Sequence, residues 1–94
     1  MGDQGFQVVQ SSPDTVSVSG ALTFATAAAA LEAIRAALPG RQVLDLKGVE
    51  RTDSAGLACV LAALAPNGGK VRVQHVPVGM QQLAKVCEVD GLLG

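Results

Sequence analysis

Alternation of apolar and polar residues at the start of the chain predicts a β-hairpin. Residues 6–10 alternate weakly and are rich in valine, and residues 11–14 contain the Ser, Pro and Asp typical of a turn. Residues 15–19 then alternate strictly with period two and stop at Gly20, as expected of a half-buried strand. We therefore predict two strands joined by a short turn.

A helical pattern replaces this alternation at residues 26–38, where leucine and isoleucine recur on one face of an alanine-rich segment. Pro39 and Gly40 end that helix, because proline cannot continue it and glycine accepts the left-handed conformation of its C-terminal cap. Residues 42–46 follow as a short, mostly apolar strand, which suits a central position in the sheet.

The second half of the chain repeats the strand and helix pattern. After a polar loop at residues 47–52, a helix is expected over residues 54–65, with Asp53 or Ser54 as its cap and residues 66–69 as its stop.

Three valines within residues 71–76 predict another strand, and residues 77–79 lead into a last amphipathic helix. The apolar face of that helix is formed by Met80, Leu83, Ala84 and Cys87.

The element order is therefore β-β-α-β-α-β-α, which predicts the α/β fold class. Helices between strands imply right-handed crossovers and a mixed, largely parallel sheet of four strands with helices packed on one side. A length of 94 residues allows one modest core, so we expect residues 1–94 to form a single domain. Hydrophobic residues make up 49% of the chain but aromatic residues only 2%, so small aliphatic side chains must build this core.

Charge and hydropathy exclude several classes of partner. The net charge of -1 lacks the basic excess of a nucleic-acid binder. The apolar runs at residues 27–31 and 55–65 are shorter than the roughly 20 residues that a membrane span needs. The N-terminus lacks the basic and apolar pattern of a signal peptide. The expected location is the cytoplasm, with no nucleic-acid partner and no membrane span.

Catalytic and metal-binding patterns are also missing. Cys59 and Cys87 are far apart, without nearby ligands at metal-binding spacing, so we expect two buried free thiols and no metal. His75 is the single histidine and has no nucleophile at a motif spacing. Residues 68–70 resemble a phosphate-binding loop only in part, because Lys70 is followed by Val71 instead of Ser or Thr. We expect no catalytic residue, no cofactor and no enzyme activity.

The start of the helix at Ser54 is the most informative segment. The backbone N–H groups of a first helical turn lack intrahelical partners, and the helix dipole adds partial positive charge there. Ala55 and Gly56 leave space for a phosphate on Ser54 to approach these groups. A simpler alternative is that Asp53 or Ser54 only caps the helix and that Gly56 only permits close packing.

The helix itself carries no charge between Asp53 and Lys70, although the outer face of a surface helix is normally polar. Two compatible explanations remain: neighbouring helices bury it, or it presents a flat apolar surface that a partner covers. The residues expected on this outer face are Ala55, Ala58, Cys59, Ala62 and Ala63.

These segments together resemble the STAS domain, named after sulphate transporters and anti-sigma factor antagonists. The resemblance rests on the hairpin, on the Leu-Asp-Leu strand at residues 44–46 and on the Asp-Ser-Ala-Gly-Leu motif at residues 53–57. It implies docking onto a partner protein without catalysis, with Ser54 as the phosphorylated or partner-contacting residue. The partner-binding residues that we expect are Asp53, Ser54, Ala55, Gly56, Leu57, Ala58 and Ala62.

Two subfamilies compete within this resemblance. Anti-sigma factor antagonists, which act as serine phospho-switches on a partner kinase, usually have an acidic residue where this chain has Thr23. The run at residues 20–26 looks more like the MlaB-type STAS proteins of phospholipid-trafficking ABC transporters. That resemblance implies an accessory subunit that binds the cytoplasmic ATPase subunit, supports transporter assembly or activity, and lies peripheral to the inner membrane through its partner.

Overall fold

The computed structural model describes residues 5–67 and 70–93 and contains one four-stranded sheet. Its strands lie in the order β1-β2-β3-β4, with β1 antiparallel to β2 and with β2, β3 and β4 mutually parallel. The predicted fold is confirmed in its element order and in its mixed sheet. The elements are β1 (Phe6–Ser12), β2 (Thr15–Leu22), α1 (Ala27–Ala37), β3 (Val43–Thr52), α2 (Ser54–Leu64), β4 (Arg72–Gln74) and α3 (Val78–Val86), with short 3-10 turns at Ala65–Asn67 and Asp90–Leu93.

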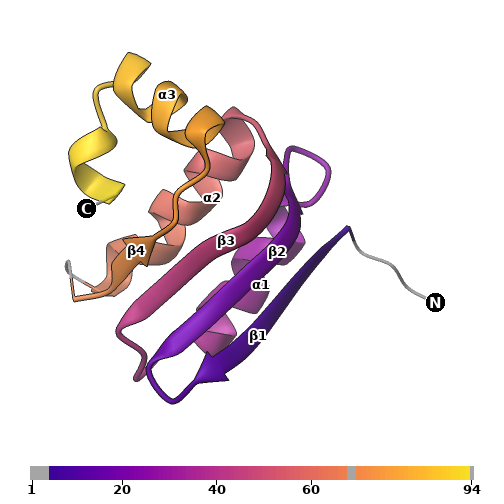
Figure 1. Cartoon of the computed structure of the whole chain (residues 1–94), viewed down its shortest axis with the longest axis vertical. Helices are drawn as coiled ribbons and strands as arrows, with labels where there is room; N and C mark the ends of the chain where they lie inside the picture. The colour runs from indigo at the N-terminus through magenta and orange to yellow at the C-terminus, as the bar shows by residue number, and fades with distance from the viewer. Residues whose placement is uncertain (1–4, 68–69, 94) are drawn as a thin grey trace.

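The helices α1 and α2 cover the same face of the sheet (Figure 1). Helix α1 lies against β1 and β2, whereas α2 lies against β2 and β3 and separates α1 from α3. This arrangement places α2 in the middle of the helical layer. The opposite face of the sheet carries no helix among the described residues (Figure 1).

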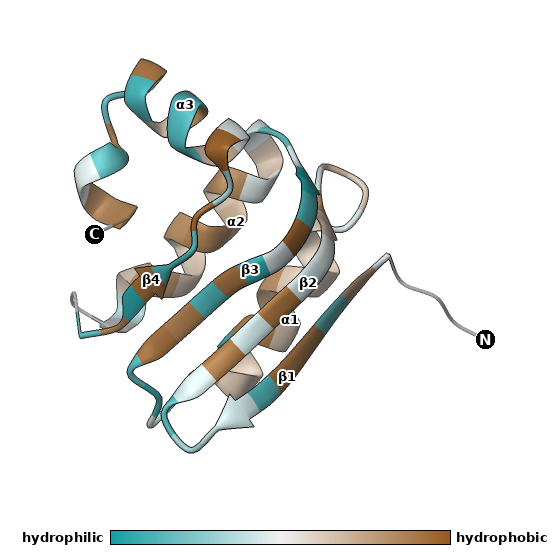
Figure 2. Ribbon diagram, in the orientation of Figure 1, coloured by the Kyte–Doolittle hydropathy of each residue, from teal (hydrophilic) through white to brown (hydrophobic). Residues whose placement is uncertain are grey.

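Alternating side chains along β2 and β3 explain why the core lies between sheet and helices. Figure 2 shows that apolar and polar residues alternate along both strands. Val16, Val18, Leu44 and Leu46 are buried, while Ser17 between the two valines is only half-buried. A strand directs successive side chains to opposite faces, so this alternation determines which face the helices cover.

Strand β3 is longer than the pattern predicts, and the expected loop at residues 47–52 is wrong. The second half of β3 pairs in parallel with the end of β2, where Gly20 lies opposite Val49 and Leu22 opposite Thr52. The backbone groups of this polar segment thus find partners in a distant strand, which outweighs its composition. Gly48 permits the close approach, since a Cβ there would lie 2.7 Å from the Cβ of Ser19.

Other differences lie near the C-terminus. Strand β4 spans only three residues, and Val76 lies outside it. Cys87 is exposed at the end of α3, so the expectation of two buried thiols holds only for Cys59. Gly68 and Gly69, which belong to the predicted stop of the second helix, lie outside the described residues.

Candidate functional site

The first turn of α2 is capped by the side chain of Asp53. Its Oδ1 accepts hydrogen bonds from the backbone N–H groups of Ala55 and Gly56, at 2.9 and 3.1 Å. Asp53 itself has an extended backbone, as expected of an N-cap residue. Of the two caps that the sequence left open, the structure selects Asp53, so the Ser54 side chain is free of the capping role.

The same carboxylate joins α2 to the loop between β2 and α1. Its second oxygen, Oδ2, accepts a hydrogen bond of 3.1 Å from the backbone N–H of Phe24. This bond is the main reason that the pKa of Asp53 is lowered; the Ala55 and Gly56 N–H groups act in the same direction, and some desolvation opposes them. Three donors therefore stabilise the ionised carboxylate.

Gly56 holds the start of α2 unusually close to the sheet. A Cβ on Gly56 would collide with the backbone carbonyl of Leu22 and lie 2.6 Å from Oγ1 of Thr52. No other residue fits without a shift of the backbone. The short strand-to-helix connection, the Asp53 cap and this contact together fix Ser54 at the rim of the sheet.

The predicted docking residues divide into an exposed and a buried group. Ser54 and Ala58 are exposed and Ala62 is half-buried, so these side chains are available to a partner. Gly56 is buried and Leu57 is only 4% exposed, so these two hold α2 against the sheet and offer almost no surface.

The predicted outer face of α2 also needs correction. Cys59 and Ala63, expected on this face, are 3% and 1% exposed because α1 packs against that side of the helix. Leu61, expected inside, is half-buried on the same side as Ser54 and Ala58. Because α2 has no polar stripe, its sequence does not show which side faces solvent. The predicted outer face was therefore rotated too far towards α1.

Two exposed apolar side chains border the start of α2, and no pattern in the sequence singles out either of them. Phe24 is 87% exposed in the loop that Asp53 holds, and Val78 is 68% exposed at the first residue of α3. A Cβ on the next residue, Gly79, would lie 3.8 Å from Cγ2 of Thr52, which places the start of α3 beside the start of α2. We call Phe24, Ser54, Ala58, Ala62 and Val78 the α2 surface.

An apolar hollow continues this surface along α2. It has a volume of about 270 Å³ and lies at the C-terminal end of the helix. Its lining residues are Leu61, Leu64, Ala65, Val71 and Leu92.

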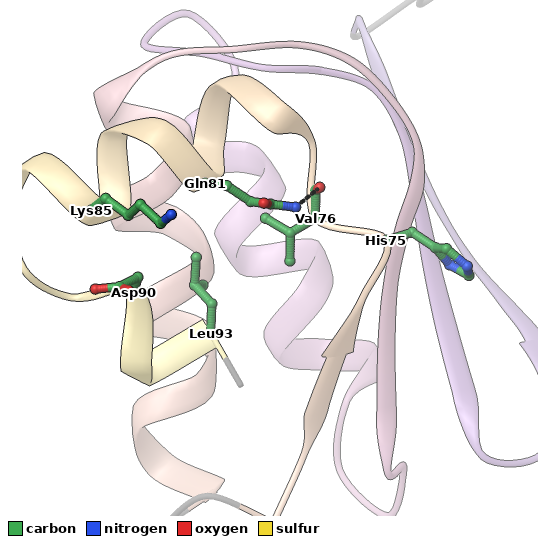
Figure 3. A pocket seen from close by; sticks show the side chains of 6 residues that line it. All are labelled: His75, Val76, Gln81, Lys85, Asp90 and Leu93. Atoms are coloured by element: carbon green, nitrogen blue, oxygen red, sulfur yellow. Dashed lines mark hydrogen bonds between the residues drawn. The ribbon is translucent and has the colours of Figure 1, made fainter.

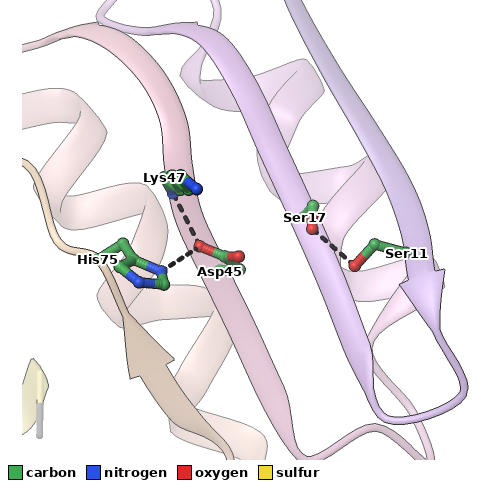
Figure 4. Close-up of polar contacts among 5 residues, drawn as sticks. All are labelled: Ser11, Ser17, Asp45, Lys47 and His75. Carbon is green, nitrogen blue, oxygen red and sulfur yellow. Dashed lines mark hydrogen bonds and ion pairs between the residues drawn. The ribbon is translucent and has the colours of Figure 1, made fainter.

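A second polar cluster lies on the helix-free face of the sheet. Nδ1 of His75 lies 2.9 Å from Oδ1 of Asp45, which also accepts the backbone N–H of Lys47 at 2.9 Å (Figure 4). Burial alone would raise the pKa of Asp45, but the Lys47 hydrogen bond and His75 outweigh it and lower that pKa. This pair joins residues 30 positions apart, and no local pattern in the sequence predicts it.

The Asp45 and His75 pair resembles the oriented base of a hydrolase but lacks a nucleophile. The Ser17 hydroxyl donates to Ser11 at 2.8 Å and points away from the pair (Figure 4). Within residues 5–67 and 70–93, no hydroxyl or thiol forms a hydrogen bond with the His75 ring. The geometry therefore supports no acyl-transfer chemistry at this place.

A shallow pocket of about 400 Å³ lies between the segment after β4 and the C-terminal turn. Lys85, Asp90 and His75 are among its lining residues, and the His75 ring points towards the sheet (Figure 3). No group of three or more potential metal ligands occurs among the described residues. In the same part of the chain, no helix has the length and hydropathy to cross a bilayer.

Comparison with known families assigns the fold just described. The family model described as "Mlab, STAS domain" matches residues 7–94. The chain belongs to the STAS family. The Asp53–Leu57 motif of this STAS chain lies at the strand-to-helix junction, where its Asp caps α2 and its Ser is exposed.

A solved structure agrees with this assignment. The STAS chain is similar to the anti-sigma factor antagonist SpoIIAA in its unphosphorylated form, with a TM-score of 0.66 and 16% sequence identity. The match covers 93% of this chain and 84% of the other. At this identity the likeness establishes the fold. No curated protein sequence matches the chain.

Proposed function

We propose that this STAS domain is a non-enzymatic accessory subunit that binds the ATPase subunit of a phospholipid-trafficking ABC transporter through its α2 surface. The observation that carries the proposal is the surface itself, in which Phe24 and Val78 border an α2 face without a charged side chain. In this role the domain is cytoplasmic and reaches the inner membrane only through its partner.

The composition of the α2 surface suits a protein partner better than a small substrate. Ala58 and Ala62 let a partner helix approach closely, and the hollow beside Leu61 extends the apolar contact. Each Å² of apolar area covered contributes about 25 cal/mol before the costs of association are subtracted. The charged residues Glu50 and Arg51 are exposed near the end of β3, as the polar rim of an interface would be.

Ser54 supplies the regulatory alternative, an anti-sigma factor antagonist that a partner kinase phosphorylates. Its exposure and its freedom from the capping bond make it accessible to a kinase. The structural likeness to SpoIIAA favours this candidate. Thr23 favours the transporter role, because an antagonist usually carries an acidic residue there. In this structure Thr23 serves the turn instead, with its N–H bonded to Oγ1 of Thr26.

A capture experiment with purified components tests the proposal. The full chain, immobilised, is offered the ATPase subunit or an anti-sigma kinase, and the bound amounts are compared with those on the variants Ala58→Arg, Ala62→Arg and Ser54→Glu. Arginine brings a charge and a long side chain into the contact. The glutamate charge is stabilised by the helix N-terminus of the free domain but must be desolvated under a partner. We expect each variant to keep its thermal stability and lose ATPase capture.

The matched control is Ala36→Arg, since Ala36 is an exposed alanine on α1, away from the α2 surface. Equal capture by the wild type, Ala62→Arg and Ser54→Glu would place the interface elsewhere. Kinase capture with incorporation of phosphate at Ser54, and no ATPase capture, would favour the antagonist.

A further inference from the structure

Among the described residues, no strand or helix covers the outer edge of β1. Most exposed edge strands carry charge or proline, or are very short, because their unpaired backbone groups otherwise recruit other strands. Strand β1 spans seven residues and contains neither charge nor proline. The opposite edge strand, β4, spans only three residues and includes Arg72. The contrast singles out β1 as the edge that a partner strand can extend.

The register of the hairpin identifies which backbone groups point outwards. The N–H of Ala21 donates to the carbonyl of Gly5, so the odd-numbered residues of β1 direct their backbone groups towards β2. Phe6, Val8 and Gln10 lie in the alternate positions and direct theirs to the outside. Among the described residues, these three have no backbone partner beyond the hairpin.

From this edge we infer that the chain forms a symmetric dimer in which β1 pairs antiparallel with β1 of a second copy. The edge is self-complementary: with Val8 opposite Val8 of the second copy, Phe6 lies opposite Gln10, and every outward N–H meets an outward carbonyl. Val9, which is 49% exposed on the other face, then lies opposite Gln7 and loses solvent contact. The two four-stranded sheets become one continuous sheet.

The helical layer fits the same two-fold arrangement. Helix α1 lies over β1 and β2, so the two copies of α1 are separated by two strand spacings, about 10 Å. Packed helices lie about 8–10 Å apart. Arg35 lies near Cys59 and therefore on the side of α1 that faces α2. The opposite flank of α1, towards β1, carries Ala29, Ala33 and Ala37. These small, uncharged side chains permit the contact.

The size of this flank predicts a weak dimer. Five strand residues span about 17 Å, and the domain is 19 Å thick along its shortest axis, so the area lies at the low end for specific interfaces. The dimer is therefore expected to dissociate in the micromolar range. It leaves α2 and α3 of each copy free, because α1 lies between these helices and the β1 edge (Figure 1).

Sedimentation of the full chain between about 5 and 500 µM tests the inference. We expect the wild type to shift from monomer to dimer over this range. Val8→Pro removes the central outward N–H without touching the β1–β2 ladder, and we expect it to raise the dissociation constant at least tenfold. Ala29→Glu places two like charges at the contact between the copies of α1, so it should also raise the dissociation constant.

Ala28→Glu is the matched control, because Ala28 is an exposed alanine on the Arg35 side of α1. It is expected to dimerise as the wild type does. A wild type that stays monomeric at the highest concentration would overturn the inference, as would a Val8→Pro variant that dimerises unchanged. These outcomes are independent of ATPase capture, which reports on the α2 surface.

Discussion

Oδ2 of the Asp53 carboxylate accepts a hydrogen bond of 3.1 Å from the backbone N–H of Phe24, which lies 29 positions earlier in the chain. The same group caps α2 through its other oxygen. One side chain thus fixes the start of the helix and the loop that presents Phe24. The cap of α2 and the position of the Phe24 loop are therefore two consequences of one carboxylate.

Acid should weaken this junction. The pKa of Asp53 is lowered in the folded state, chiefly by the Phe24 N–H, so its charge stabilises the fold above the unfolded pKa of about 4. That contribution is lost as the pH falls from about 4 through the lower pKa of the folded state. We expect Asp53→Asn to lower the melting temperature at pH 6 and the difference from the wild type to shrink towards pH 3. Circular dichroism melts across this range measure it; a difference that is independent of pH would show that the charge contributes nothing.

Two glycines should respond in opposite ways to alanine. In Gly56→Ala the new Cβ meets the Leu22 carbonyl, a backbone group that cannot move aside, so the free energy of unfolding should fall by about 2–3 kcal/mol. In Gly79→Ala the Cβ makes only an ordinary contact, 3.8 Å from Thr52, and the helix gains up to about 1 kcal/mol. Urea unfolding of both variants gives these values. If Gly56→Ala were as stable as the wild type, α2 would not lie so close to the sheet.

The two thiols should differ in reactivity. Cys59 is 3% exposed, and burial raises the pKa of its thiol, although Arg35 partly opposes this. Cys87 is exposed at the end of α3. Titration with a thiol reagent should therefore modify Cys87 readily in the native protein and Cys59 only after unfolding. Rapid modification of Cys59 in native Cys87→Ser protein would contradict its burial under α1.

The sequence predicted well what depends on neighbouring residues. The order of strands and helices follows from local periodicity, and the local residues limit the cap of α2 to Asp53 or Ser54, of which the structure selects Asp53. The second half of β3 was missed because its partners lie in β2, far away in the chain. No pattern within residues 47–52 predicts pairing with a strand so distant in the chain.

The position of helix α2 in the chain was predicted, but not which of its faces is exposed. Helix α2 is apolar on all sides, so its sequence does not tell which face α1 covers, and Cys59 and Ala63 were placed outside. The Asp45–His75 pair was missed for another reason. The contact depends on the pairing of β3 with β4, which places Asp45 opposite Gln74, and His75 next to Gln74 has a positive φ of 57°. Neither feature can be read from the local sequence.

Phe24 offers the sharpest test of the α2 surface. Its side chain is 87% exposed and the Asp53 bond reaches only its backbone, so Phe24→Ala should change the free energy of unfolding by less than about 0.5 kcal/mol. Aromatic side chains in interfaces often contribute much of the binding energy, so the same variant should weaken ATPase capture at least about tenfold. Phe6→Ala is the matched control, because Phe6 packs against the core and its loss should destabilise the fold. Its stability is measured at low concentration, where the chain is monomeric. The fraction of this variant that remains folded should bind the ATPase subunit as the wild type does. Unfolding curves and binding isotherms for both variants separate stability from docking. A Phe24→Ala variant that binds as tightly as the wild type would remove this residue from the interface, and one that unfolds like Phe6→Ala would show that its side chain serves the fold.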